Sequence, residues 1–418
     1  MGRYGVEGGH PLQGSVKVSG SKNASLALIA AATMAPGVTV LEGIPAIRDV
    51  EVMLAITRAL GGEAQWVGAG RLSLRIPTGL NTTVPFAEGR QIRASSLFLG
   101  ALVAAQGRAE VPLPGGCDLG PRPVDLHLKG LAALGAQVEV EHGLIKARAK
   151  SLEGARIYLD FPSVGATENL MMAACQARGQ TVIENAAREP EVVDLANFLN
   201  AMGAHIRGAG TDVIKIDGPT VWRPATYSVI PDRIEAGTFL IMGAVCGGPL
   251  RVVNVISTHL QPVIAKLREA GATVEEGEGL LEVYREGPLA PVHVKTMPYP
   301  GFPTDLQSPM LVLLSQARGT SIVVETVFDN RFQVVQELQR MGANIRVEGS
   351  AAVVVGSTPL CGAEVQIPDL RAGAALTIAA LLARGETILD RTGCLERGYE
   401  NWWDKLTRLG ARLRPLPE

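Results

Sequence analysis

Apolar stretches of helical length recur along the chain, and each is closed by a Gly followed by a small residue. The six pairs are Gly61-Gly62, Gly135-Ala136, Gly203-Ala204, Gly271-Ala272, Gly342-Ala343 and Gly410-Ala411. The first glycines of successive pairs are 74, 68, 68, 71 and 68 residues apart. A nearly constant period over the whole chain indicates six copies of one structural unit.

Each unit follows the same order of hydrophobic patterns, and the fifth shows it plainly. An apolar helix is predicted over 310–317, a β-branched strand over 320–326, an amphipathic helix over 330–341 and an alternating strand over 344–349. The glycine after the second helix is typical of a helix stop with positive φ. Units of about 70 residues exceed solenoid repeats, so they are predicted to be supersecondary units of βαβαββ type.

Six units divide most simply into two domains of three. The segment from Gly218 to Asp232 contains three prolines and is predicted to cross between them. The last unit lacks a final strand, and the opening segment, with its alternating run from Gly14 to Val18, is expected to supply it. The predicted domains are therefore 22–229, which is continuous, and 1–21 plus 230–418, with the active site expected in the cleft between them.

Composition narrows the class of protein. Hydrophobic residues make up 47% of the chain and the net charge is −2, which provides a large core and no basic field for nucleic acid. We expect no signal peptide and no membrane span. An odd number of cysteines, five, without a CxxC pair is typical of a reduced protein of the cytoplasm. No metal-binding cluster is evident from the six histidines.

The starts of the six first helices share a chemical character. They read GSKNASL, IRASSLF, SVGATEN, PDRIEAGTF, PTDLQSPM and PDLRAGAA, all small, polar or charged. Helix N-termini attract anions, and Lys22, Arg93, Arg233 and Arg371 add positive charges. Serines, threonines and aspartates at these positions are also ordinary N-caps. Lys22 opposes the helix dipole, however, and therefore requires an anionic partner.

One loop differs from its five counterparts. Residues 113–125 carry three prolines and three glycines around a single thiol, Cys117. Such a segment packs poorly, whereas Cys175 and Cys246 lie in apolar helices and are expected in the core. Arg122 lies close in sequence and would tune the thiol pKa. Cys117 is the strongest candidate for a chemically active residue.

These motifs together resemble those of the UDP-N-acetylglucosamine 1-carboxyvinyltransferase family, the enolpyruvyl transferases of UDP-N-acetylglucosamine. The segments that carry the resemblance span the chain in order: SGSKNA, the PGGC loop with RPVDLH, SVGAT, IENAAREPE, PDRIEAGTF, PTDLQ, ETVFDNRF, PDLRAGAAL and ERGYENWWDKL. The resemblance implies the inside-out α/β barrel fold (EPT/RTPC-like). It also implies transfer of enolpyruvate from phosphoenolpyruvate to the 3-hydroxyl of UDP-N-acetylglucosamine in the first committed step of peptidoglycan precursor synthesis.

The resemblance also assigns roles to residues. Cys117 corresponds to the general acid, and Asp305 to the base or the group that orients the hydroxyl. Lys22 and Asn23 match a phosphoenolpyruvate-binding pair, and Arg122 and Arg397 match the arginines that hold its phosphate and carboxylate. The sugar-nucleotide contacts correspond to Arg93, Arg122, Pro123, Val124, Asp125, Leu126, Ser163, Val164, Gly165, Asp305 and Val327, while Asp369 lies near the reacting centre.

The resemblance implies no cofactor and a Cys117 that is sensitive to fosfomycin. From the net charge and the lack of long apolar runs we expect no nucleic-acid or membrane partner, and we expect a monomer. Phe161 stands where some relatives carry a basic residue, so the uridine-side contacts there stay open. The sister family, 5-enolpyruvylshikimate-3-phosphate synthase, shares the six-unit fold, but Asn23 and the Cys117 loop argue against it. The sequence also leaves open a non-enzymatic clamp on nucleic acid and a paralogue with altered activity.

Overall fold

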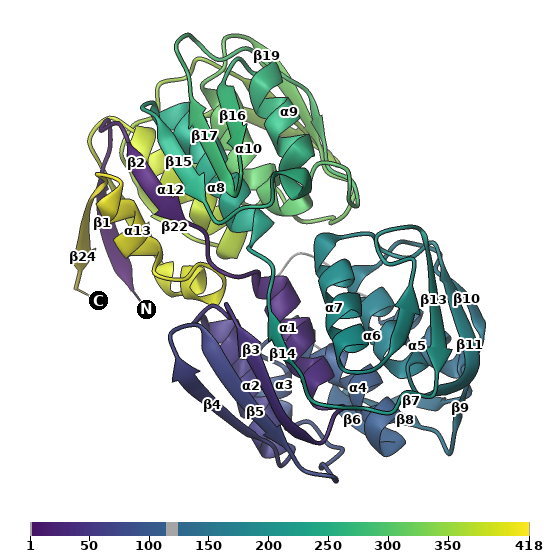
Figure 1. Cartoon of the computed structure of the whole chain (residues 1–418). Helices are drawn as coiled ribbons and strands as arrows, with labels where there is room; N and C mark the ends of the chain where they lie inside the picture. Colours follow the sequence, from purple (N-terminus) through teal and green to yellow (C-terminus); the bar gives the residue numbers. More distant parts are fainter. Residues whose placement is uncertain (1, 114–123, 418) are drawn as a thin grey trace. The chain divides into compact units, whose positions relative to one another are not determined.

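The computed structural model in Figure 1 describes residues 2–113 and 124–417. The described chain forms two compact units, one of residues 20–113 and 124–230, the other of residues 2–19 and 231–417. We refer to them as the continuous unit and the discontinuous unit. The chain crosses between them at 19/20 and at 230/231, where the sequence prediction places the crossings at 21/22 and 229/230.

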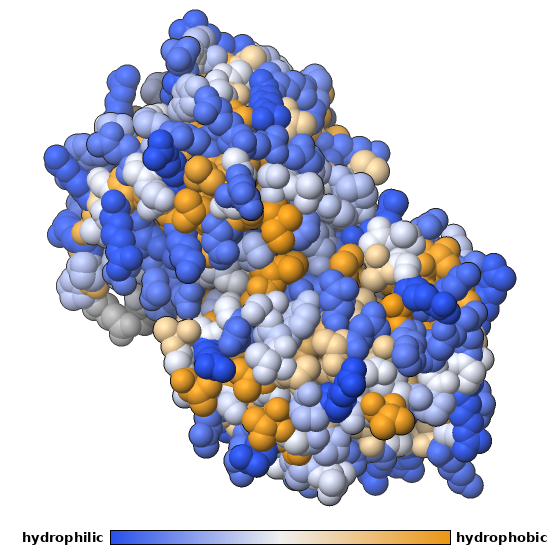
Figure 2. All heavy atoms as spheres, in the orientation of Figure 1, coloured by the Kyte–Doolittle hydropathy of each residue, from blue (hydrophilic) through white to orange (hydrophobic). Residues whose placement is uncertain are grey.

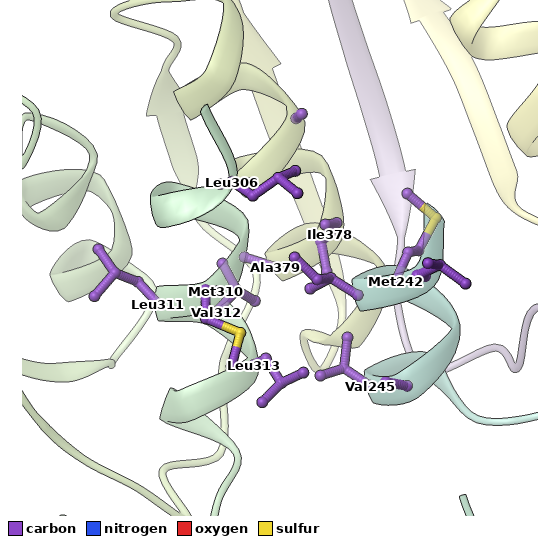
Figure 3. Close-up of a cluster of buried hydrophobic side chains, with 14 of the residues drawn as sticks. Met242, Val245, Leu306, Met310, Leu311, Val312, Leu313, Ile378 and Ala379 are labelled. Carbon is purple, nitrogen blue, oxygen red and sulfur yellow. The ribbon is translucent and has the colours of Figure 1, made fainter. Parts of the chain in front are cut away.

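Three apolar helices fill the centre of each unit. In the continuous unit they are α1 (Lys22–Ala32), α4 (Leu97–Gln106) and α6 (Val164–Ala174), and in the discontinuous unit α8 (Arg233–Cys246), α10 (Gln307–Ser315) and α12 (Leu370–Leu382). Most of their residues are buried, because these helices are apolar on all sides and have no face for water. Figure 3 shows Met242, Met310 and Ile378 of the three discontinuous-unit helices in one cluster.

The second helix of each of the six sequence repeats is amphipathic and packs outside the three central helices. These helices are α2 (Arg48–Ala59), α5 (Asp125–Ala133), α7 (Pro190–Ala201), α9 (Gln261–Glu269), α11 (Val334–Arg340) and α13 (Trp402–Arg408). Shorter segments are α3 (Phe86–Gly89) and the 3₁₀ turns η1 (Arg93–Ser96), η2 (Ser257–Leu260), η3 (Thr304–Leu306) and η4 (Thr392–Arg397).

Within the described residues the strands form six sheets that share one order. A strand pairs parallel with its neighbour, and two further strands follow, each antiparallel to the one before. The continuous unit contains β14 (Thr226–Ser228), β3 (Gly37–Glu42), β5 (Arg71–Ile76) and β4 (Glu63–Gly68); β6 (Arg108–Pro112), β8 (Leu144–Arg148) and β7 (Gln137–Glu141); and β10 (Arg156–Tyr158), β11 (Ala177–Glu184), β13 (Val213–Gly218) and β12 (His205–Arg207), with β9 (Leu152–Glu153) beside β11. In the second of these sheets, a single parallel bridge from Thr83 to Glu110 replaces the first strand.

The discontinuous unit repeats the order three times. Its sheets are β2 (Gly14–Lys17), β15 (Leu250–Val253), β17 (Leu280–Tyr284) and β16 (Thr273–Gly277); β18 (Val294–Lys295), β19 (Thr320–Val324), β21 (Ala351–Val355) and β20 (Asn344–Glu348); and β22 (Glu364–Gln366), β23 (Glu386–Asp390), β1 (Arg3–Glu7) and β24 (Arg412–Leu416). Central helices with sheets around them make each unit an inside-out α/β barrel, which confirms the predicted fold class.

The N-terminal strand that completes the last unit is not the one expected. The run from Gly14 to Val18 was the expected donor, but its strand β2 pairs parallel with β15 of the fourth unit. Strand β1 instead lies antiparallel between β23 and β24. The alternating pattern indicated a strand correctly, but pairing partners are set by tertiary packing rather than by the pattern of a single strand.

Each crossing leads directly into a central helix. In the continuous unit, Ser21 N donates to Ile230 O at 2.7 Å, and the Ser21 side chain caps α1. In the discontinuous unit, Asp232 N donates to Ser19 O at 2.9 Å, and the Asp232 side chain caps α8. The two crossing segments are therefore hydrogen-bonded to each other within each unit.

The surface is mixed in character. Hydrophilic residues cover most of the face drawn in Figure 2, with hydrophobic residues interspersed among them. The exposed large hydrophobic residues come from many separate elements, as is normal for a domain surface. In the described part of the chain, no helix has both the length and the apolar character needed to span a bilayer.

All six predicted helix-stop glycines have positive φ, between +89° and +111°. In every case the next residue donates its N–H to the carbonyl five residues earlier, as Ala272 does to Leu267 at 2.9 Å. This is the Schellman bond that satisfies a free carbonyl at a helix end. The prediction of glycine stops is confirmed at Gly61, Gly135, Gly203, Gly271, Gly342 and Gly410.

We expect Gly271→Ala to lower the free energy of unfolding by roughly 1 to 2 kcal/mol, because an L-residue at φ +89° is strained. A new Cβ would meet no atom nearer than 3.8 Å, so crowding does not contribute. Urea denaturation measures the difference. Gly287→Ala is the control, since Gly287 is exposed and outside the left-handed region. Equal stability of the two variants would contradict the assignment.

Candidate functional site

Asp305 of η3 binds two buried arginines in the discontinuous unit. Its Oδ1 accepts from Arg331 Nη2 at 2.7 Å, and its Oδ2 accepts from Arg371 Nη2 at 2.8 Å and Nε at 3.1 Å. The Arg331 and Arg371 side chains are 3% and 6% exposed, whereas the Asp305 side chain is 24% exposed. The carboxylate thus neutralises two buried cations while keeping part of its surface accessible.

The two arginines determine the protonation state of Asp305. Burial by itself raises the pKa of the carboxyl, but the charges and hydrogen bonds of Arg371 and Arg331 outweigh it. The pKa of Asp305 is therefore held well below its usual range. In this arrangement the group is an ionised hydrogen-bond acceptor and a weak base.

Neighbouring caps hold these helix starts in place. The Asp369 side chain caps α12 by accepting from Arg371 N at 2.8 Å and Ala372 N at 3.0 Å. A first-turn carboxylate at an N-cap satisfies free N–H groups and interacts favourably with the helix dipole. Asp232 acts likewise on α8, and its charge also reaches Arg371. The starts of α8, α10 and α12 therefore lie together, as the three-unit arrangement predicts.

Glu325 connects Asp305 with the loop that contains Val327. It is buried, and its carboxylate accepts from Thr304 Oγ1 at 2.9 Å and from Val327 N at 2.8 Å. Thr304 directly precedes Asp305, so one side chain fixes both sugar-contact candidates of this unit. Val327 is half-buried.

Arg397 ends η4 and is followed by a buried tyrosine. Tyr399 is 2% exposed, and its hydroxyl lies 3.1 Å from Thr238 Oγ1 of α8. The Thr238 hydroxyl itself donates to Ile234 O at 2.7 Å, so the tyrosine hydroxyl is the donor in that pair. The guanidinium of Arg371 lies over the Tyr399 ring, 5.6 Å from its centroid. The Arg397 segment and the Asp305 cluster therefore share a contact.

Lys22 has an anionic partner within the continuous unit. Its Nζ lies 2.9 Å from Asp49 Oδ2 of α2, and the two side chains are 13% and 4% exposed. The sequence argument required such a partner, and the protein itself supplies one. Asn23, the next residue, is exposed.

His127 of α5 is buried and connects the starts of α4, α5 and α6. Its Nδ1 accepts from Asn169 Nδ2 at 2.8 Å, and the same amide nitrogen donates to Ser96 O at 2.7 Å. On the other side of the ring, a Cβ placed on Gly165 would lie 3.4 Å from His127 Cε1. Gly165 therefore lets the first turn of α6 approach the imidazole closely.

The environment of His127 keeps it neutral. Burial and then the charge of Arg93 lower the pKa of the imidazole to about 4, with Asp125 opposing them. Arg93, at the start of η1, thus lies near the first turns of α5 and α6. These turns contain the predicted contacts Asp125, Leu126, Val164 and Gly165, while Ser163 caps α6 by accepting from Ala166 N at 3.3 Å.

Some predicted site residues lie outside the described residues, namely Cys117, Arg122 and Pro123. Val124 is the first described residue after them and precedes α5. Of the other cysteines, Cys175 is buried as expected, and Cys246 is partly buried at the end of α8. In the described ranges no three His, Cys, Asp or Glu side chains are arranged to hold a metal ion.

Sequence reasoning missed several of the residues that build these clusters. Arg331, Asp49, His127 and Asn169 lie at distances along the chain that no local spacing connects to Asp305, Lys22 or Gly165. Arg371 is among the positive charges expected to attract anions at helix starts, and in the structure it is paired with Asp305. Arg233 lies over the Tyr299 ring, 5.5 Å from its centroid. The charged character of the helix starts indicated Arg233 and Arg371 only.

Comparison with known proteins gives consistent results. A family model described as EPSP synthase (3-phosphoshikimate 1-carboxyvinyltransferase) matches residues 6–406. The UDP-N-acetylglucosamine 1-carboxyvinyltransferase 1 of Carboxydothermus hydrogenoformans is 52% identical over 99% of this chain and 98% of its own. The corresponding protein of Halothermothrix orenii is 50% identical over the full length of both.

Solved structures match over nearly the whole chain as well. The enolpyruvyl transferase NikO from Streptomyces tendae has a TM-score of 0.91 at 28% identity and covers 99% of each chain. EPSP synthase from Acinetobacter baumannii has a TM-score of 0.76 at 20% identity over both full chains, which shows the shared fold.

We expect His127 to destabilise the protein in acid. Its folded pKa, about 4, lies below the unfolded value of 6.5, so the unfolded chain binds more protons between these two pH values. The free energy of unfolding therefore decreases as the pH is lowered from 6.5 towards 4. From pH 7 to pH 5 the loss due to His127 is about 2 kcal/mol. Urea denaturation at both pH values should show a smaller loss for His127→Gln than for the wild type. The same substitution at exposed His205 is the control, and an equal loss in all three proteins would refute the prediction.

Proposed function

The chain belongs to the EPSP synthase family of enolpyruvyl transferases and, within it, to the UDP-N-acetylglucosamine 1-carboxyvinyltransferases; from this we propose its reaction. It transfers the enolpyruvyl group of phosphoenolpyruvate to the 3-hydroxyl of UDP-N-acetylglucosamine and releases phosphate. The observation that carries this conclusion is identity near 50% over the full length of relatives that bear that name.

The reaction proceeds by addition and elimination. In the addition, the sugar 3-oxygen bonds to C2 of phosphoenolpyruvate, C3 gains a proton and the hydroxyl loses one. In the elimination, the bond from C2 to the phosphate oxygen breaks, C3 loses a proton and the double bond is restored. The protein must therefore supply an acid for C3, an acceptor for the hydroxyl proton and cations for two polyanionic substrates.

Asp305 suits the role of orienting the sugar hydroxyl better than that of accepting its proton. Its lowered pKa makes it a weak base, but a fully ionised carboxylate held by Arg331 and Arg371 orients a hydroxyl firmly. We assign it the hydroxyl-orienting role, and its 24% exposed side chain leaves room for that contact. Val327 contacts the sugar nucleotide from the loop that Glu325 fixes.

The remaining roles follow the resemblance. Lys22, Asn23, Arg122 and Arg397 bind phosphoenolpyruvate, and Cys117 is the acid. Arg93, residues 122–126 and the α6 start at Ser163, Val164 and Gly165 bind the UDP-sugar, where free N–H groups of a helix start favour diphosphate. Asp369 caps α12 and so holds Arg371 beside Asp305.

The wider setting is part of the same proposal. The enzyme acts as a cytoplasmic monomer in peptidoglycan precursor synthesis, and so in cell-wall biogenesis, cell shape and division. Fosfomycin alkylates Cys117. Transfer to shikimate 3-phosphate is the second candidate, because the matching family model is described by that activity. The names of the relatives near 50% identity favour UDP-N-acetylglucosamine.

We expect phosphate release from phosphoenolpyruvate with UDP-N-acetylglucosamine and none with shikimate 3-phosphate. Cys117→Ser should reduce the rate by about 100-fold or more, since an alcohol is a far weaker acid than a thiol. Cys361→Ser, which changes an exposed cysteine, is the control and should keep full activity. Release only with shikimate 3-phosphate, or with neither acceptor, would overturn the proposed function.

Asp305→Asn should lower kcat by about 100-fold while the KM for phosphoenolpyruvate changes less. Loss of the carboxylate charge leaves two buried arginines uncompensated, so the free energy of unfolding should also fall by roughly 3 kcal/mol. Circular dichroism and denaturation verify that the variant is folded at the assay temperature. A folded Asp305→Asn variant with near wild-type kcat would exclude Asp305 from the reaction.

A further inference from the structure

A partly buried polar cluster surrounds Ser19 in the discontinuous unit. The Ser19 backbone N donates to Glu235 Oε2 at 3.0 Å, and its hydroxyl donates to Glu400 Oε2 at 2.6 Å. Lys405 Nζ donates both to Ser19 Oγ at 2.7 Å and to Glu235 Oε1 at 2.5 Å. Glu235 is 1% exposed and the Lys405 side chain 14% exposed. Every bond has a defined direction, so the cluster holds Ser19 in one position.

The cluster joins two segments that are far apart in the sequence. Ser19 ends the first crossing segment and precedes Lys22 by three residues, whereas Glu400 follows Arg397 by three residues. Both Lys22 and Arg397 are assigned to phosphoenolpyruvate. The Ser19 hydroxyl is the atom that bonds to both Glu400 and Lys405, which lie on either side of the α13 start.

The Arg397 segment has little freedom beyond the cluster. Tyr399 is buried between Thr238, Arg371 and Trp402, whose ring centroid lies 4.6 Å from its own. Ser19 therefore bonds to a segment that is already held by its own packing within the discontinuous unit.

We propose that Ser19, Glu235, Glu400 and Lys405 form an anchor that positions the phosphoenolpyruvate-binding segment of Arg397, with the Ser19 hydroxyl as its central group. The role of the anchor in substrate binding rests on the proposed function. Its residues are positioning residues, because they act through Arg397. The sugar-nucleotide contacts Arg93, Ser163, Gly165 and Val327 lie on other elements, so the anchor affects one substrate selectively.

Steady-state phosphate release tests this selectivity, with each substrate varied while the other is saturating. Ser19→Ala deletes the two hydroxyl bonds and keeps the backbone bond to Glu235. It should raise the KM for phosphoenolpyruvate about tenfold, the effect of losing a hydrogen bond to a charged group, and change the KM for UDP-N-acetylglucosamine less than about twofold. Ser19→Thr restores a hydroxyl at a partly exposed position and should restore the KM.

Ser228→Ala is the matched control. It also removes a hydrogen bond from serine to glutamate, from Ser228 Oγ to Glu42 Oε2 at 3.2 Å, on the segment of the second crossing. It should leave both KM values unchanged. An unchanged KM for phosphoenolpyruvate in Ser19→Ala, an equal rise in both KM values, or no rescue by Ser19→Thr would overturn the anchor.

Amide hydrogen exchange separates the anchor from the proposed function. Exchange in residues 391–405 should be faster in Ser19→Ala than in the wild type and Ser228→Ala. If the wild type releases no phosphate with UDP-N-acetylglucosamine, the proposed function fails. Amide hydrogen exchange is then the measurement that tests the anchor. Unchanged exchange in that segment would then overturn it, and faster exchange would support it.

Discussion

The structure depends on the burial of three helices that are apolar on all sides. In each unit such helices cannot present a face to water, so amphipathic helices and sheets must enclose them. One sequence repeat, made of a helix, a strand, a second helix and further strands, covers only part of a central helix. Three repeats are needed to enclose the three central helices of a compact unit. The six-fold repeat of the sequence is the consequence of this requirement.

Burying the central helices creates a second demand at their starts. Free N–H groups in the first turn must find partners, and the chain meets this in the same way in both units. The first and third central helices have side-chain caps, Ser21 and Ser163 in one unit and Asp232 and Asp369 in the other. The second begins with a 3₁₀ turn, η1 or η3. Polar groups therefore accumulate where the proposed chemistry needs them.

Buried carboxylates hold both crossing segments. Asp194 of α7 accepts from Tyr227 Oη at 2.6 Å on the second crossing, and Glu235 accepts from Ser19 N on the first. Burial raises the pKa of Asp194 to about 6 and that of Glu235 to about 7, and their hydrogen-bond donors oppose the rise. Near neutral pH such carboxylates are partly or fully ionised, and in that form they are strong acceptors for these donors.

The sequence by itself determined what depends on neighbouring residues. Glycine stops at positive φ, the apolar central helices and capped helix starts with charges follow from local backbone and side-chain chemistry, and the structure has them where predicted. The resemblance supplied the roles of Lys22, Asp305 and Arg397, because motifs survive in order along the chain. Only the tertiary structure decided which strand completes the last sheet, and that Asp49 pairs with Lys22 and Arg331 with Asp305. Such contacts join residues that are distant in sequence, and their energies depend on burial and geometry that the order of residues does not express.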